Sequence, residues 1–182
     1  MTGLGGQGVQ LIAKLLAHAA MSEGRQVMMF GLFMGTIRGG SSESTVVVGD
    51  GEIVTPPLVP HAWGVLAMHG DGLAKLAAKA EPGGLLLLNS SLVAAPSAWP
   101  DVRVLAVPAT ALAKDVGQPM GAGMVALAAL AAATELVAVA SLDAALDAVL
   151  PPHRRAQIDG NRRCLARGAA WIAEAGLPAA SA

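Results

Sequence analysis

Residues 1–8 (MTGLGGQG) and 9–23 (VQLIAKLLAHAAMSE) decide the fold of this chain. Gly3, Gly5 and Gly8 match G-x-G-x-x-G, the pattern of a turn between a strand and a helix at which backbone approaches a phosphate or another chain. The apolar run that follows the turn predicts one helix, with the next glycine as its C-terminal cap. Because only four residues precede Gly5, the first strand is predicted to be short.

A second glycine-rich loop follows the next predicted strand, residues 25–30. The loop spans residues 31–40 (GLFMGTIRGG) and carries Arg38, with Ser41 immediately after it. We expect the two glycine loops to follow adjacent strands and to form one crevice, since ligands bind at such places in open α/β sheets. Arg38, beside free backbone N–H groups and hydroxyls, either binds an anion or pairs with a carboxylate across a subunit interface.

The rest of the chain alternates strand and helix patterns. Further strands are predicted at residues 44–48, 63–68, 85–88 and 102–107, and helices at 73–80, 109–116, 123–135, 141–150 and 153–175. We also expect residues 52–54 to pair back as a hairpin partner, the Pro-Gly-Gly at 82–84 to break the structure before the next strand, and Ser141 to cap its helix. The prediction is a single α/β domain over residues 1–182, a three-layer Rossmann-like fold with a mainly parallel sheet and a helical C-terminal third.

Composition excludes several classes of function. Hydrophobic residues make up 54% of the chain and charged residues 14%, which predicts apolar surface that another subunit covers. The net charge is −1 without a basic stripe, which argues against nucleic acid as a partner. A single cysteine, Cys164, can form neither an internal disulfide nor a [4Fe–4S] cluster within this chain. The apolar run at residues 120–133 is too short to span a membrane, and with no signal-peptide pattern a cytoplasmic protein is expected.

No catalytic constellation or metal-ligand spacing is visible. The second strand ends without the acidic residue that would hold the ribose of NAD, so the glycine turn favours close packing or another phosphate ligand over a dinucleotide. His69, beside Asp71, has no nucleophile to activate and is interpreted as a structural or solvated residue. Cys164 is interpreted as a small core residue. Asn89 ends a buried strand, where it either faces a ligand or caps the next turn. The sequence therefore predicts no catalytic residue and no metal ligand in this chain.

Several short sequences occur in the order of a known family. They are residues 3–9 (GLGGQGV), 38–40 (RGG), 44–50 (STVVVGD), 82–84 (PGG), 89–91 (NSS) and 107–110 (VPAT). The chain resembles the gamma subunit, or the gamma domain of fused enzymes, of the 2-oxoacid:ferredoxin oxidoreductases. This family includes pyruvate, 2-oxoglutarate, 2-oxoisovalerate, indolepyruvate and phenylglyoxylate oxidoreductases. Residues 33–37 (FMGTI) depart from the aromatic-Gly-Pro-Glu-Met run of many members, and Gly123 stands where the family often has Asn, so the 2-oxoacid stays open.

The resemblance implies a non-catalytic subunit in an enzyme that oxidatively decarboxylates a 2-oxoacid, usually to an acyl-CoA. Thiamine diphosphate, Mg²⁺ and [4Fe–4S] clusters would lie on alpha, beta and ferredoxin-like delta subunits. Electrons would pass to ferredoxin, or through an FAD-bearing chain to NAD. The residues expected on the coenzyme A side or at a subunit interface are Gly5, Gly6, Gln7, Gly8, Arg38, Gly39, Gly40, Ser41 and Asn89. The alternatives are a free-standing NAD(P)-binding oxidoreductase domain and a non-enzymatic assembly module.

Overall fold

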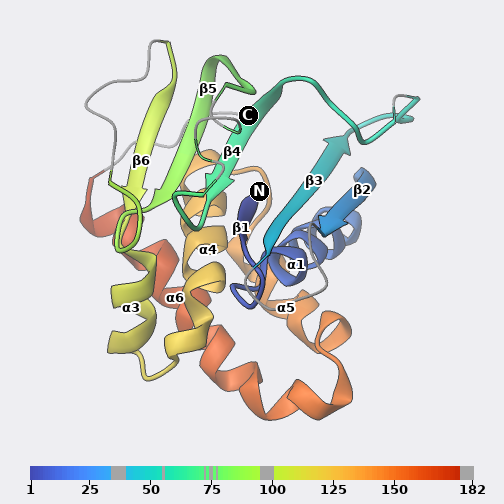
Figure 1. Cartoon of the computed structure of the whole chain (residues 1–182). Helices are drawn as coiled ribbons and strands as arrows, with labels where there is room; N and C mark the ends of the chain where they lie inside the picture. The colour runs from blue at the N-terminus through green and yellow to red at the C-terminus, as the bar shows by residue number, and fades with distance from the viewer. Residues whose placement is uncertain are drawn as a thin grey trace.

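The computed structural model describes residues 1–33, 40–54, 56–71, 73, 76, 78–94 and 101–176. The strands are β1 (Thr2–Leu4), β2 (Gln26–Phe33), β3 (Ser41–Gly49), β4 (Ala62–Ala67), β5 (Ala80–Asn89) and β6 (Arg103–Val107). The helices are α1 (Val9–Ser22), α3 (Ala109–Asp115), α4 (Ala122–Thr134), α5 (Val139–Val149) and α6 (Ile158–Glu174), with 3₁₀ turns η1 (Pro119–Gly121) and η2 (Pro152–Gln157). Figure 1 shows the α/β arrangement, and its helical C-terminal third confirms that prediction.

The six strands form one sheet in the order β2-β3-β1-β4-β5-β6. β1 and β4, β4 and β5, and β5 and β6 pair in parallel, whereas β3 is antiparallel to both β1 and β2. The predicted mainly parallel sheet is therefore confirmed. The expectation that β1 and β2 are adjacent is wrong, because a short connection between β2 and β3 allows them to pair only as a hairpin, and β3 then occupies the place beside β1. Since β3 runs in the opposite direction to β1, it begins at the edge where β1 ends.

One large hydrophobic cluster joins the described helices to one face of the sheet. Leu66, Leu85 and Leu87 contribute from the strands, and α1, α3 and α4 lie over them (Figure 1). Helix α4 is buried along nearly its whole length, because α6 covers the side that faces away from the sheet. A smaller cluster on the other face includes Leu86 and Leu88. Among the described residues, no helix is both long and apolar enough to cross a membrane.

Two local predictions are wrong. Residues 52–54 form no strand; the turn before them is held instead by an ion pair of 2.8 Å between Arg25 and Asp50, and β3 already has β2 as its hairpin partner. Ser141 is not an N-cap, since α5 begins at Val139. The backbone N–H before that helix, on Ala138, donates instead to the Glu23 carboxylate at 2.8 Å. The Glu23 carboxylate, at the end of α1, thus takes the capping role that was predicted for the Ser141 hydroxyl.

Strand β5 begins five residues earlier than the pattern predicted. Its pairing with β4 shifts between Ala62 and Gly64, so that the Pro-Gly-Gly at 82–84 is absorbed as an irregularity within the strand. Gly83 has φ +80°, a conformation that favours glycine. Of the helix predicted for residues 73–80, residues 74, 75 and 77 lie outside the described residues, and Ala80 already belongs to β5.

Candidate functional site

The glycine turn between β1 and α1 has the strand–turn–helix form that the sequence predicts. Gly6 and Gly8 have φ of +103° and +76°, so both positions need glycine. The Gly5 N–H donates to the Gly40 carbonyl at 2.8 Å, and the next residue, Ser41, pairs with Leu4. The end of the second glycine loop therefore lies against the first. Arg38 and Gly39, the other predicted residues of that loop, lie outside the described residues.

The Gln7 side chain points into the protein. Its Oε1 accepts the Leu4 N–H at 2.7 Å, and its Nε2 donates to the Met68 carbonyl at 3.5 Å. Gly3 needs to lack a side chain here, because a Cβ would lie 2.7 Å from Gln7 Oε1. Gln7 thus joins the end of β1 to the end of β4 and holds the turn in shape.

The Asn89 side chain caps a helix, although the helix is α3 further along the chain and not the turn that follows β5. Asn89 is buried, and its Nδ2 donates to the Met68 carbonyl at 3.4 Å and to Thr110 Oγ1 at 2.9 Å. Its Oδ1 accepts the Thr110 N–H at 3.2 Å, and Ser91 Oγ accepts the Ala111 N–H at 3.2 Å. Two side chains at and just after the end of β5 therefore cap α3, whose own N-cap, a proline, supplies no side-chain hydrogen bond. The buried amide thus ties the end of β5 to the start of α3.

A hollow of about 390 Å³ opens beside the glycine turn, and we call it the glycine-turn groove. It is lined by Leu4, Gly5, Gly6, Gly8, Val9, Gln10, Leu11, Lys14, Ser42, Val149, Pro151 and Arg154. No side chain caps α1. The Ile12 N–H donates to the Gly8 carbonyl at 3.0 Å, which is the first hydrogen bond of the helix. The N–H groups of the first turn of α1 consequently have no helical partner, and the helix dipole favours an anion at this end.

Two cations complete the glycine-turn groove, and the sequence analysis missed both. Lys14 lies on α1 and Arg154 on η2; both are exposed, and within the described residues neither side chain makes an ion pair. Among the described residues that line the groove, none carries a carboxylate. Lys14 follows Gln10 by one helical turn, a spacing visible in the sequence, but nothing local connects Arg154 with the first helix. The groove thus combines helix N–H groups with two positive charges, a donor set suited to phosphate.

Gln10 fixes the wall of the groove. Its Nε2 donates to the Glu43 carbonyl at 2.7 Å and to Ser42 Oγ at 3.4 Å. Gly31 on β2 leaves space for this side chain, because a Cβ there would collide with Gln10 Oε1. Beyond Lys14 the surface stays hollowed along α1, in a second depression of about 390 Å³ whose lining includes His18. The site could therefore hold an elongated ligand.

The remaining candidate residues have structural surroundings. His69 Nδ1 accepts the Asp71 N–H at 3.2 Å. Cys164 is fully buried, and burial raises the pKa of its thiol to about 11. The interpretation of Cys164 as a core residue is confirmed. Among the described residues, no group of three or more His, Cys, Asp or Glu side chains could hold a metal ion.

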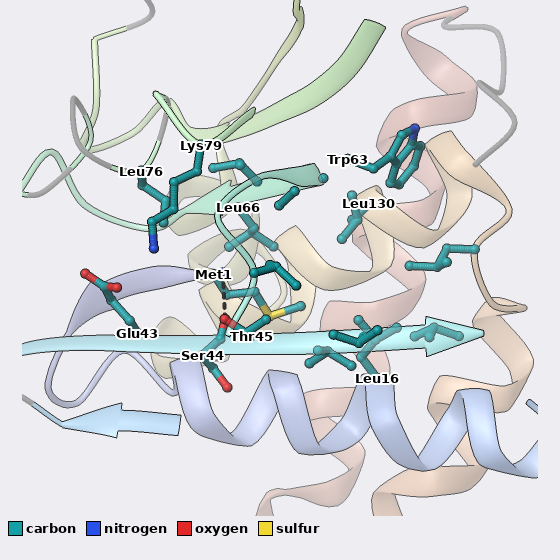
Figure 2. A pocket seen from close by; sticks show the side chains of 18 of the residues that line it. Met1, Leu16, Glu43, Ser44, Thr45, Trp63, Leu66, Leu76, Lys79 and Leu130 are labelled. Atoms are coloured by element: carbon teal, nitrogen blue, oxygen red, sulfur yellow. Dashed lines mark hydrogen bonds between the residues drawn. The ribbon is translucent and has the colours of Figure 1, made fainter. Parts of the chain in front are cut away.

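A separate cavity, of about 270 Å³, lies between β3 and β4 beyond the amino end of β1, and we call it the sheet slot. Figure 2 shows Met1 at its floor, with Leu16 and Leu130 on the helix side and Leu76 and Lys79 on the other. The lining is mostly apolar, so this cavity has a different chemistry from the glycine-turn groove.

The amino group of Met1 donates to the Ser44 carbonyl at 2.9 Å, and burial lowers its pKa from 8.0 to about 6. The unfolded chain therefore binds a proton between pH 6 and 8 that the folded chain releases, so stability rises with pH across this range. We expect the free energy of unfolding to increase by roughly 2 kcal/mol, measured by urea denaturation at pH 6, 7 and 8. An unchanged free energy of unfolding between pH 6 and pH 8 would contradict this assignment.

Comparison with known proteins places the chain. Residues 1–171 match the profile of the pyruvate ferredoxin/flavodoxin oxidoreductase family. Ketoisovalerate oxidoreductase subunit VorA of Methanothermobacter thermautotrophicus is 31% identical over 179 residues, which are 96% of this chain and 36% of that protein. The chain thus spans about a third of the length of this relative.

Two solved structures share the fold. The gamma subunit of a keto/oxoacid ferredoxin oxidoreductase from Geobacter sulfurreducens has a TM-score of 0.77 and 27% identity, over 95% of this chain and 96% of that one. The 2-oxoglutarate:ferredoxin oxidoreductase of Magnetococcus marinus, solved with 2-oxoglutarate, coenzyme A and succinyl-CoA bound, has a TM-score of 0.85 and 22% identity, over 99% of this chain and 31% of that one. With the glycine turn, the six-stranded sheet and these matches, the resemblance inferred from the sequence is confirmed: the chain belongs to the pyruvate ferredoxin/flavodoxin oxidoreductase family.

Proposed function

We propose that this chain is the gamma subunit of a multi-subunit, thiamine-diphosphate-dependent 2-oxoacid oxidoreductase, and that its glycine-turn groove binds phosphate groups of coenzyme A. The observation that carries the proposal is that Lys14 and Arg154 line one groove beside the amino end of α1, which no side chain caps. The reaction is the oxidative decarboxylation of a 2-oxoacid to an acyl-CoA, and coenzyme A, when bound, supplies the thiol that accepts the acyl group. The role of this chain is to bind and orient.

The groove fits this ligand chemically. Coenzyme A carries several phosphate oxygens, and the first-turn N–H groups after Gly8, with Lys14 and Arg154, offer donors and positive charge from two directions. Gln7 holds the glycine turn in shape, and Gln10 holds the wall of the groove in place. An enzyme of the same fold has been solved with coenzyme A bound, which agrees with the proposal.

An apolar surface supports assembly with partner chains. Met28, Phe30 and Leu32 alternate along β2, at the edge of the sheet, and are 38%, 38% and 39% exposed. Val47 and Thr45, which pair with Met28 and Phe30, extend the same face on β3. Exposed apolar patches of this kind mark interaction sites. We infer that this face contacts alpha, beta or delta subunits, which would hold the thiamine diphosphate, Mg²⁺ and iron–sulfur clusters in the cytoplasm.

Purification of the tagged chain from its native host tests the subunit assignment. Absorbance at about 400 nm from iron–sulfur clusters, together with thiamine diphosphate and co-purifying chains, is the expected result. The complex should then oxidise one or more of pyruvate, 2-oxoglutarate, 2-oxoisovalerate, indolepyruvate and phenylglyoxylate with ferredoxin or NAD as acceptor. A colourless chain that purifies alone and binds a nicotinamide cofactor tightly would support the NAD(P)-binding alternative instead. Colourless partners without thiamine diphosphate would support an assembly module.

Substitution of the two cations tests the coenzyme A site. In the purified complex, Lys14→Ala and Arg154→Ala should each raise the KM for coenzyme A by about 5- to 10-fold, because each removes one charge-assisted contact of roughly 1 kcal/mol. The KM for the 2-oxoacid should stay unchanged. Arg155→Ala is the matched control, since Arg155 is the exposed neighbour on η2 and does not line the groove. An equal effect of all three substitutions, or none, would contradict the assignment.

A further inference from the structure

The second depression continues the glycine-turn groove along α1. Both hollows measure about 390 Å³, and their linings share Lys14 and Val149. From these shared residues the glycine-turn groove extends to the start of α1, and the second depression extends toward the end of that helix. The other residues that line the second depression are Ala17, His18, Met21, Met29 and Ala148. We call it the His18 depression, and it gives the proposed coenzyme A site a second compartment.

The His18 depression lies over α1, between β2 and the end of α5. Lys14, His18 and Met21 follow one another at helical spacing and therefore share one face of α1. Met29 comes from β2 and Ala148 from the last turn of α5, and α1 packs against both elements (Figure 1). Along the axis of α1, His18 lies about 6 Å beyond Lys14. This is the scale of the separation between the phosphates and the base of a nucleotide.

The lining of the His18 depression suits a flat ring better than another phosphate. Apart from Lys14 and His18, its described side chains are small or apolar. Histidine stacks on nucleotide bases, and the thioethers of Met21 and Met29 belong to a class that makes favourable contacts with aromatic rings. Ala17 is buried and adds no polar group to the floor. Met21 is 49% exposed, so an occupant of the depression would cover apolar surface.

The end of α5 supplies hydrogen-bond acceptors beside the His18 depression. In an α-helix, each carbonyl accepts from the N–H four residues further along the chain. The residues four positions after Asp147 and Ala148 are Pro151 and Pro152, and proline has no N–H. These two carbonyls therefore have no helical donor, and Ala148 lines the depression. Carbonyl acceptors suit an amino group and disfavour a phosphate, whereas the N–H groups at the start of α1 have the opposite preference.

We propose that the His18 depression binds the adenine base of coenzyme A, with Lys14 between the base and the phosphates. This inference rests on the proposed function, because it takes the glycine-turn groove as the phosphate site. The adenine ring lies against His18, Met21 and Met29, and its amino group donates to the carbonyls at the end of α5. The chain thereby recognises its thiol substrate by the nucleotide end, so 4′-phosphopantetheine, which carries no nucleotide, is a poor substitute for coenzyme A.

Calorimetric titration of the purified complex separates binding of the base from binding of the phosphates. ADP carries adenine and two phosphates, inorganic pyrophosphate carries no base, and IDP has a ring carbonyl in place of the adenine amino group. ADP should bind about 10-fold more tightly than either of the other two probes, because only ADP both fills the depression and donates to the carbonyls of α5. Equal Kd values for ADP and IDP would overturn the proposal.

Two substitutions on α5 locate the base. Ala148→Ile places a rigid branched side chain in the His18 depression, and Ala144→Ile is the matched control one turn earlier. Both alanines are exposed, and Ala144 lines neither hollow, so neither change disturbs the core. Ala148→Ile should raise the Kd for ADP by about 10-fold and leave the Kd for pyrophosphate unchanged, whereas Ala144→Ile should change neither. A Kd for ADP that is unchanged in Ala148→Ile would overturn the proposal.

Lys14→Ala distinguishes failure of the base assignment from failure of the coenzyme A site. It should raise the Kd for both ADP and pyrophosphate, because Lys14 acts on the phosphates. If Lys14→Ala weakens both probes while Ala148→Ile weakens neither, or weakens both equally, the base lies elsewhere and the proposed coenzyme A site stands. If Lys14→Ala changes neither Kd, the groove is not the phosphate site, and both proposals are wrong.

Discussion

Substitution of Gly168 by alanine is expected to lower the stability of the protein by about 3 kcal/mol, which corresponds to a fall in Tm of roughly 6–12 °C. Gly168 lies in α6, where that helix crosses α4, and a Cβ there would collide with the Val125 carbonyl oxygen. Backbone cannot rotate away as a side chain can, so the two helices must separate. α4 packs between α6 and the sheet, so the separation loosens the main hydrophobic cluster.

Gly160→Ala is the matched control in the same helix. A Cβ at Gly160 would approach the end of the Gln118 side chain, at 2.8 to 3.1 Å, and that flexible amide can move. Alanine also has a higher helix propensity than glycine by about 1 kcal/mol. We therefore expect Gly160→Ala to be close to neutral in thermal or urea unfolding. Similar losses in both variants would show that the α4–α6 contact is not the cause.

Substitution of Asn89 by alanine is expected to cost about 3 kcal/mol in the free energy of unfolding. The buried amide serves the Met68 carbonyl and both the N–H and the hydroxyl of Thr110. Its loss leaves several buried polar groups unpaired and frees the end of α3 from β4 and β5. Urea unfolding measures the loss, and the fluorescence of Trp63 in β4 reports on the sheet.

Ser91→Ala provides the comparison for Asn89. Ser91 caps the same helix through the Ala111 N–H, but it is exposed, so water replaces the lost bond and the expected cost is about 1 kcal/mol or less. If instead Asn89→Ala retained full stability while the KM for coenzyme A rose, Asn89 would act at the ligand site and its structural assignment would be wrong.

Local patterns were read correctly where a short run of residues is sufficient. The glycine turn, α1, α4 and the buried strands follow from residue spacing within one turn or one strand, since steric limits on backbone and the burial of periodic apolar positions act over a few neighbours. The errors fell where a distant segment supplied the partner. Asn89 and Glu23 cap helices that begin far along the chain, and no local pattern at those helices reveals it.

The sequence by itself determined the family, the α/β class and the glycine turn at the start of α1, because each depends on neighbouring residues. Only the tertiary structure brought Lys14 and Arg154 to one groove, placed β3 between β1 and β2, and revealed the sheet slot beside Met1. Each of these is a contact between segments separated by many residues. Such contacts arise from the packing of the sheet against its helices, and the spacing of residues along the chain does not predict them.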